Sequence, residues 1–323
     1  MSNYNKSYNS TREMLQRDRI FRENLEKIDA MNAKSKASGK HNAATFGINE
    51  LADLTEEEMS KRLGLKNLPK APPTKLYHGP RHGLGVVDAV TVDHVADGHM
   101  TPVKNQGGCG SCWAFTANTT LEGVISAKTG KAPYHISEQQ MVDCTLRNNQ
   151  HNMDMFDYDY GQGGCNGGWM FGGWHFQRAQ GAMLEEDYPY TSGRTGTESK
   201  CVHDWDKTVG DRPRDWGILN STLDDVKALV KKMPLSLAIE AGAPFSFYKS
   251  GVVSVEDGCG TNINHGVVLV GYTEKEAEPE PEPEPEPEVN CSVFTWWHEC
   301  EDKKEDRRML KKDANGYENY WKI

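Results

Sequence analysis

The residues best suited to chemistry lie at 109–113 (CGSCW), with Gln106 three positions upstream. A free thiol has a pKa near 8.5 and is mostly protonated at neutral pH, but the oriented N–H groups of a helix N-terminus favour the thiolate. Cys112 stands where a Gly-rich turn leads into an expected amphipathic helix that ends near 129–130. Acyl transfer also needs donors for a developing oxyanion, and the Cys112 backbone N–H and the Gln106 amide are candidates. We therefore predict that Cys112 is a nucleophile.

Three other interpretations of this CxxC run remain open. A redox pair normally lies near a βαβ pattern, and none precedes these residues. Half of a zinc site would need a second CxxC or an HxxxH at ligand spacing, which the sequence lacks. A structural disulfide is the third interpretation, and we expect it for Cys109 alone.

A nucleophilic thiol needs a base, and the chain has eleven histidines. His265 differs from the others because it opens the run 266–272 (GVVLVGY), whose small and β-branched residues are typical of a buried strand. A residue at the start of such a strand is held rigidly, and small neighbours leave room for a substrate. We predict that His265 is the base.

Length and charge limit the possible functions. The 323 residues suffice for one large or two modest domains, and the 47 acidic against 37 basic residues argue against a nucleic-acid binder. No apolar run approaches the 18 residues that a membrane span needs. The charge is uneven: residues 1–80 are net basic, whereas the Glu-Pro tract at 274–288 is strongly acidic and is expected to be an extended spacer.

The elements that must position these residues can be outlined from patterns. Ser10 and Glu13 form a capping pair before a helical apolar spacing, and Thr55 with Glu58 predicts a second helix that stops at Gly64. Segment 66–90 lacks periodicity and is interpreted as a linker open to proteolytic cleavage, and 147–164 as a loop. Strands are expected at 234–241, 265–272 and 316–323.

Several blocks together resemble the papain-like cysteine peptidases, in the order of that family. These blocks are 101–115 (TPVKNQGGCGSCWAF), Asp143-Cys144, 164–168 (GCNGG), 188–190 (YPY) and 264–272 (NHGVVLVGY). The N-terminal segment resembles the inhibitory propeptide of the cathepsin L branch, through Glu13, Arg17, Ile20, Phe21, Asn24, Ile28, Asn32, Gly47, Asn49 and Asp53. The resemblance implies an α+β, two-lobed fold, with a helical lobe, a β-barrel-like lobe and a cleft between them, preceded by a helical propeptide.

Residue roles follow from the resemblance. Cys112 would be the nucleophile, His265 the base and later the acid, and Gln106 the oxyanion amide. Gly167 and Gly168 would pair with an extended substrate; Met170, Ala238 and Gly266 would line the pocket for the side chain two positions before the scissile bond, with Trp169 as a further wall. Simple core packing is the alternative for Met170 and Ala238. The implied disulfides are Cys109–Cys165 and Cys144–Cys201, which leaves Cys259, Cys291 and Cys300 as an odd set.

The implied domains are an inhibitory propeptide with its processing linker at 1–80 and a peptidase at 81–323, with the acidic insertion at about 273–314. The expected protein is a monomeric zymogen of a cysteine endopeptidase that acts on peptides and proteins in protein catabolism. Its propeptide would be its intramolecular inhibitor, it would need no cofactor or metal, and it would work in a lysosome or vacuole or outside the cell.

Three departures from the family pattern stand out. The His-orienting Asn of the family would follow Ile323, so that residue and the last barrel strands are expected to be absent. Residue 1 falls within the propeptide, with no apolar leader before it, and His94 stands where the family usually has Trp. An impaired protease homologue or a protease-binding inhibitor is therefore the alternative function.

Overall fold

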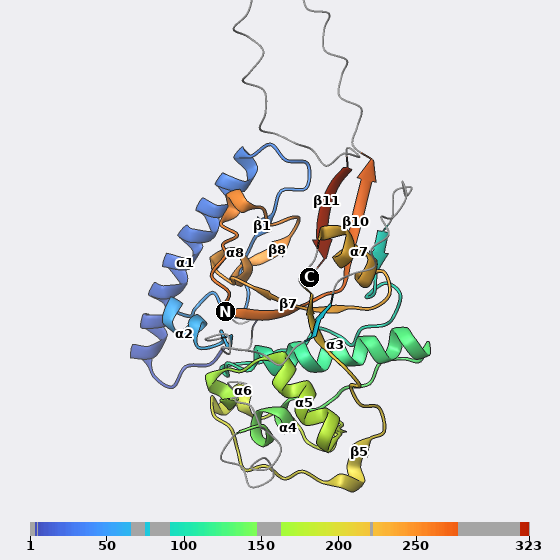
Figure 1. The fold of residues 1–323 in the computed structure, drawn as a ribbon. Helices are drawn as coiled ribbons and strands as arrows, with labels where there is room; N and C mark the ends of the chain where they lie inside the picture. The colour runs from blue at the N-terminus through green and yellow to red at the C-terminus, as the bar shows by residue number, and fades with distance from the viewer. Residues whose placement is uncertain are drawn as a thin grey trace, which may run out of the picture.

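The molecule has one mainly helical region and another that holds most of its strands (Figure 1). The computed structural model describes residues 4, 6–65, 75–77, 91–146, 163–219, 222–276 and 317–322. The helical region contains α3 (Cys112–Thr129), α4 (Glu138–Cys144), α5 (Met170–Gln180) and α6 (Ser192–Thr195). The strand region contains β7 (Leu235–Ile239), β9 (His265–Leu269), β10 (Gly271–Glu276) and β11 (Tyr317–Lys322).

Helix α3 connects the two regions. Small residues on it, among them Ala114 and Ala117, are fully buried and allow α5 and β9 to pack closely against it. The helix ends at Gly130, whose φ of 67° is the left-handed conformation that glycine adopts at little cost. The predicted helix and its end are confirmed.

The strand region is built from two antiparallel pairings that meet at Val270. Strand β9 pairs with β7, which places Ile239 opposite His265, while β10 pairs with β3 (Thr91–Asp93) and with β11. The single strand expected at 265–272 is therefore two strands, because its two halves have different partners. Strands β7 and β11 are confirmed within the predicted segments 234–241 and 316–323.

The N-terminal helices lie along one side of the strand region (Figure 1). Helix α1 (Thr11–Ala37) begins as predicted, with the Ser10 hydroxyl accepting from the Glu13 N–H, and the predicted capping box starts α2 (Glu56–Ser60). Arg17 joins the two helices through its ion pair with Glu58. An apolar cluster attaches this unit to the strand region; it contains Ile28, Ala44, Phe46, Ala52 and Phe247.

Short elements complete the structure. Strand β1 (Thr45–Phe46) pairs with β8 (Tyr248–Ser250), β2 (Lys75–Tyr77) with β6 (Gly217–Leu219), and β4 (Ala182–Met183) with β5 (Thr208–Val209). The remaining helices are α7 (Leu223–Val230), α8 (Ala243–Ser246) and the 3-10 turns Gly164–Asn166, Trp205–Lys207 and Val255–Asp257. Most of the expected linker lies outside the described residues, and β2 is its one described part. Most of the expected 147–164 loop and of the acidic insertion also lies outside the described residues. Among the helices described, none is both long and apolar enough to cross a membrane.

Candidate active site

A tightly constrained turn places Cys112 at the first position of α3. Gly107 has φ of 60°, and a side chain there would overlap the Gly193 carbonyl oxygen, so only glycine fits. The disulfide between Cys109 and Cys165 attaches this turn to the 3-10 turn that follows, and a second disulfide joins Cys144 to Cys201. The nucleophile candidate is thus held at a helix N-terminus by covalent and backbone constraints.

A segment of the N-terminal unit, residues 62–65, lies directly over Cys112; we call it the covering segment. Its Gly64 N–H donates to Cys112 Sγ at 3.2 Å, and its Gly64 carbonyl accepts from the Gly168 N–H at 2.9 Å. The next N–H, of Leu65, donates to the Asn264 carbonyl at 3.0 Å. Asn264 precedes β9, so the covering segment is bonded to both the helical and the strand regions.

The Gln106 side chain holds the other end of the covering segment. Its Nε2 donates to the Arg62 carbonyl at 2.7 Å and to the Cys109 carbonyl at 2.8 Å. Gln106 therefore donates to a backbone carbonyl of the same segment that contacts the thiol, and donation to a carbonyl oxygen is what an oxyanion donor must provide.

Burial makes the neutral forms of both reactive groups favourable. The pKa of Cys112 is raised by burial, against the lowering effect of the surrounding backbone N–H groups, among them those of Gly266, Gly64 and Trp113. The pKa of His265 is lowered to about 4, first by burial and then by the charge of Arg62. Its buried Nδ1 has no hydrogen-bond partner in the described part of the chain. With the covering segment in place, a thiolate–imidazolium pair is disfavoured.

The side chain of Leu65 packs into an apolar cluster that also contains Cys112, at the place where the substrate pocket is expected. Leu65 is 3% exposed and belongs to the same cluster as Trp169 and Met170, with Ala238 packed against that cluster. Gly266 lies opposite Ala238 in the β7–β9 pair. A Cβ on Gly266 would be 2.9 Å from Thr116 Oγ1, so a glycine lets β9 approach α3 at this point. The structure thus brings Trp169, Met170, Ala238 and Gly266 together. Gly167 and Gly168 both adjoin Gly64 of the covering segment.

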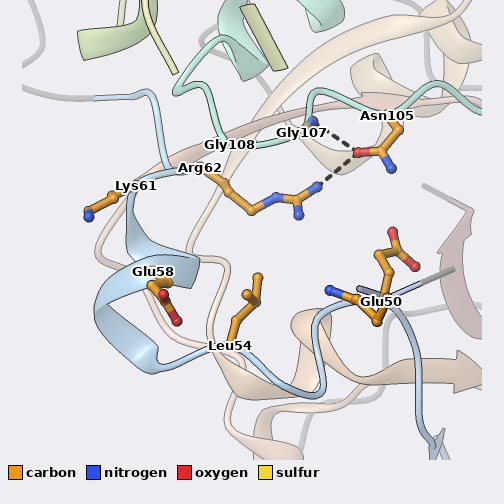
Figure 2. A pocket seen from close by; sticks show the side chains of 9 residues that line it. Glu50, Leu54, Glu58, Lys61, Arg62, Asn105, Gly107 and Gly108 are labelled. Carbon is orange, nitrogen blue, oxygen red and sulfur yellow. Dashed lines mark hydrogen bonds between the residues drawn. The ribbon is translucent and has the colours of Figure 1, made fainter. Parts of the chain in front are cut away.

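A cavity of about 350 Å³ flanks the covering segment (Figure 2). Arg62 extends from the segment toward Asn105, whose side-chain oxygen accepts from Arg62 at 3.0 Å and from the Gly107 N–H at 2.9 Å. Glu50 and Glu58 also line the cavity. The turn that carries Gln106 is therefore in polar contact with the N-terminal unit.

A buried charged network supports the start of the helical region. Lys104 Nζ lies 2.7 Å from a carboxylate oxygen of Glu122 and 2.7 Å from one of Glu138. Thr101 Oγ1 donates to the second oxygen of Glu122 at 2.7 Å, and the Ile136 N–H donates to the first at 2.8 Å. Burial raises the pKa of Glu138 to about 7, although Lys104 lowers it. The segment that leads to Gln106 is thereby fixed to α3 and α4.

Sequence reasoning missed the covering segment. The sequence pattern predicts Gly64 only as the end of a helix, and no pattern indicates its contact with a thiol 48 positions further along the chain. The available signal was the run 63–65 (LGL), in which a glycine between two apolar residues allows close approach of the backbone.

Comparisons with known proteins cover both parts of the chain. Residues 89–284 match the family described as papain family cysteine protease, and residues 1–59 match the cathepsin propeptide inhibitor domain. Cathepsin L2 of Homo sapiens is 34% identical over 78% of this chain and 70% of its own length, and caricain of Carica papaya is 34% identical over 84% and 71%. The solved procathepsin L2 proteinase from the Tenebrio molitor larval midgut has a TM-score of 0.69, with 28% identity over 84% of this chain and 82% of that one.

Proposed function

We infer the reaction from one premise: this chain belongs to the papain family of cysteine proteases. It is a cysteine-type endopeptidase with a propeptide inhibitor domain, and its α+β fold is that of the procathepsin zymogens. The family, fold class and enzyme class predicted from the sequence are confirmed. The alternative of a protein that only binds proteases gains no support from these matches.

We propose that residues 1–80 form the propeptide with its processing linker and that 81–323 form the peptidase. The support is that α1 and α2 share one apolar cluster and one Arg17–Glu58 ion pair, and that the chain then crosses the thiol at 62–65. The covering segment directs a backbone N–H, rather than a carbonyl carbon, at Cys112 Sγ. A nucleophile that faces an N–H has no carbonyl to attack, which explains how the segment can occupy the site without being cleaved.

After removal of the propeptide, the Cys112 thiolate attacks the substrate carbonyl carbon. Gln106 Nε2 and the Cys112 N–H donate to the resulting oxyanion, and His265 protonates the leaving amine. Water then attacks the thioester carbon while His265 accepts its proton, which releases the acid and restores the thiol. The observation that carries this assignment is that Gln106 Nε2 already donates to the carbonyl of Arg62, two positions before the glycine whose N–H donates to Cys112 Sγ.

A peptide substrate would make the contacts that the covering segment makes in the zymogen. Gly168, with Gly167 beside it, would pair with the extended backbone of a peptide, as Gly168 does with Gly64. The pocket that now holds Leu65 would take an apolar side chain two positions before the scissile bond. Its walls would be Trp169, Met170, Ala238 and Gly266.

An active-site probe tests the assignment. An epoxysuccinyl peptide should label Cys112 in folded, acid-processed protein and should fail with Cys112→Ser. The exposed thiol of Cys259 provides the matched control, because Cys259→Ser should leave labelling unchanged. Folded, processed protein that takes up no probe at Cys112 would overturn the proposal.

The same proposal includes the compartment, the substrates and the oligomeric state of the enzyme. Two disulfides fit an oxidising compartment, so a lysosomal, vacuolar or extracellular site of action is proposed. Peptides and proteins are the substrates, and the enzyme acts as a monomer. Fractionation of cells that produce the protein, together with light scattering of the purified chain, would test both statements.

A further inference from the structure

Three side chains that can bind a metal converge in the turn that follows β3. The ring Nδ1 atoms of His94 and His99 are 3.0 Å apart. One ring nitrogen of each histidine and one carboxylate oxygen of Asp97 all lie within 4.8 Å of one another. The cluster belongs to neither the thiol site nor the pocket of Leu65.

The turn is shaped by the backbone and by Asp93, without help from a metal. The Asp97 N–H donates to the Asp93 carbonyl at 2.9 Å, and the His99 N–H donates to the His94 carbonyl at 2.9 Å. The Asp93 carboxylate accepts from the N–H groups of Val95 and Ala96, both at 3.1 Å. The three ligands are therefore brought together before any ion binds.

A hydrogen bond to the end of α7 fixes the orientation of the His94 ring. It is 3% exposed, and its Nε2 lies 2.7 Å from the Val230 carbonyl at the end of α7. A carbonyl can only accept, so Nε2 of the ring donates to it, and in the neutral ring Nδ1, which faces His99, keeps its lone pair. A backbone carbonyl that fixes the tautomer of a histidine in this way is a common outer partner of a metal ligand.

We propose that His94, His99 and Asp97 bind one divalent transition-metal ion of the zinc class. Two nitrogens on tetrahedral zinc, each about 2.0–2.1 Å from the ion, are about 3.3 Å apart, close to the spacing already present. Two imidazoles with one carboxylate suit zinc, whereas calcium and magnesium prefer sites built from oxygen. His99 then carries its proton on Nε2, and water occupies the fourth position.

The alternative is a simple hydrogen bond between the two rings, with His99 Nδ1–H donating to His94 Nδ1. That bond explains the ring spacing but assigns no role to Asp97, whose side chain is exposed and has a carboxylate oxygen within 4.8 Å of a ring nitrogen of each histidine. A bound ion would link β3 to α7 through His94. It would thus be a structural ion that stabilises the strand region rather than a participant in catalysis.

Zinc titration of the full-length chain tests the proposal. Cys112→Ser is used as the parent, because it cannot process itself and lacks the reactive thiol. After removal of metal, competition with a chromophoric chelator should show that His99→Ala and Asp97→Asn each bind Zn²⁺ at least about tenfold more weakly than the parent. His135→Ala, which removes an exposed histidine elsewhere, is the matched control and should bind like the parent.

A second measurement separates binding from folding. Zinc should raise the Tm of the parent and of His135→Ala but not that of His99→Ala, and circular dichroism should show that all three are folded. X-ray absorption of the loaded parent should show nitrogen and oxygen ligands at about 2.0–2.2 Å and no sulfur. A parent that binds no zinc, or variants at His99 and Asp97 that bind it as tightly as the parent, would overturn the proposal. None of these readouts depends on peptidase activity.

Discussion

Replacing Gly64 by alanine should expose Cys112 in the intact zymogen. A Cβ at this position would lie 2.7 Å from the Gly110 carbonyl carbon and 3.1 Å from Cys112 Sγ. The Gly110 backbone cannot retreat, because its N–H is bonded to the Cys165 carbonyl beside the Cys109–Cys165 disulfide. The covering segment must therefore lift.

The size of the effect follows from the bonds that are lost. Lifting the segment breaks the hydrogen bond to Cys112 Sγ and those from Gly168 to Gly64 and from Leu65 to Asn264. At about 1 kcal/mol each, their loss amounts to about 3 kcal/mol. The uncovered fraction of the zymogen should then rise roughly 100-fold.

Alkylation kinetics measure this fraction. The intact chain is treated with iodoacetamide at neutral pH, and mass spectrometry follows the peptide that contains Cys112, with the exposed Cys259 as internal reference. Gly210→Ala is the matched control, because a Cβ at Gly210 would meet no atom within 4 Å. If Gly64→Ala alkylates Cys112 within about threefold of the rate of the unaltered zymogen while its Cys259 reacts normally, the reasoning is wrong.

Two further predictions concern buried charge. Lys104→Met should lower the free energy of unfolding at pH 7 by about 3–5 kcal/mol in urea denaturation, because it leaves buried carboxylates unpaired. The deficit should shrink toward pH 5 as Glu138, whose pKa is already raised to about 7, takes up a proton; a loss below about 1 kcal/mol would contradict the account. Acid should also loosen the covering segment. With the segment in place the pKa of His265 is lowered to about 4, whereas an exposed imidazole has a pKa of about 6.5. Between these values only the open site gains a proton, so lowering the pH favours opening. Opening should rise roughly 80-fold between pH 6.5 and 4. Amide exchange of 62–65 in Cys112→Ser, corrected for intrinsic rates, measures it, and a flat profile would contradict this.

The features that could be predicted from the sequence depend on neighbouring residues. The Ser10 cap, the end of the Cys112 helix at Gly130 and the strand that His265 opens each rest on a few adjacent positions, and all three are present in the structure. The division of 265–272 into two strands could not be predicted, because it depends on which distant strands pair with each half.

Long-range contacts also explain what was missed at the site. Gly64 contacts Cys112, and His94 contacts Val230 across 136 positions of the chain. Neither contact leaves a local periodicity or a familiar spacing. His94 and His99 lie five positions apart in a turn, outside the helical His spacing that sequence reasoning searches for.

Disulfides stabilise the surroundings of Cys112 more than those of His265. Both disulfides of the described residues lie between Cys109 and Cys201, in the half of the molecule that carries the nucleophile. Among the described residues, the half that carries His265 has no disulfide and contains Cys259 as a free thiol, so packing and hydrogen bonds hold it together. Local unfolding would therefore begin there under heat or denaturant, and the thiol would lose its base while its own helix is still folded. Inactivation of the processed enzyme should thus precede loss of its helical signal.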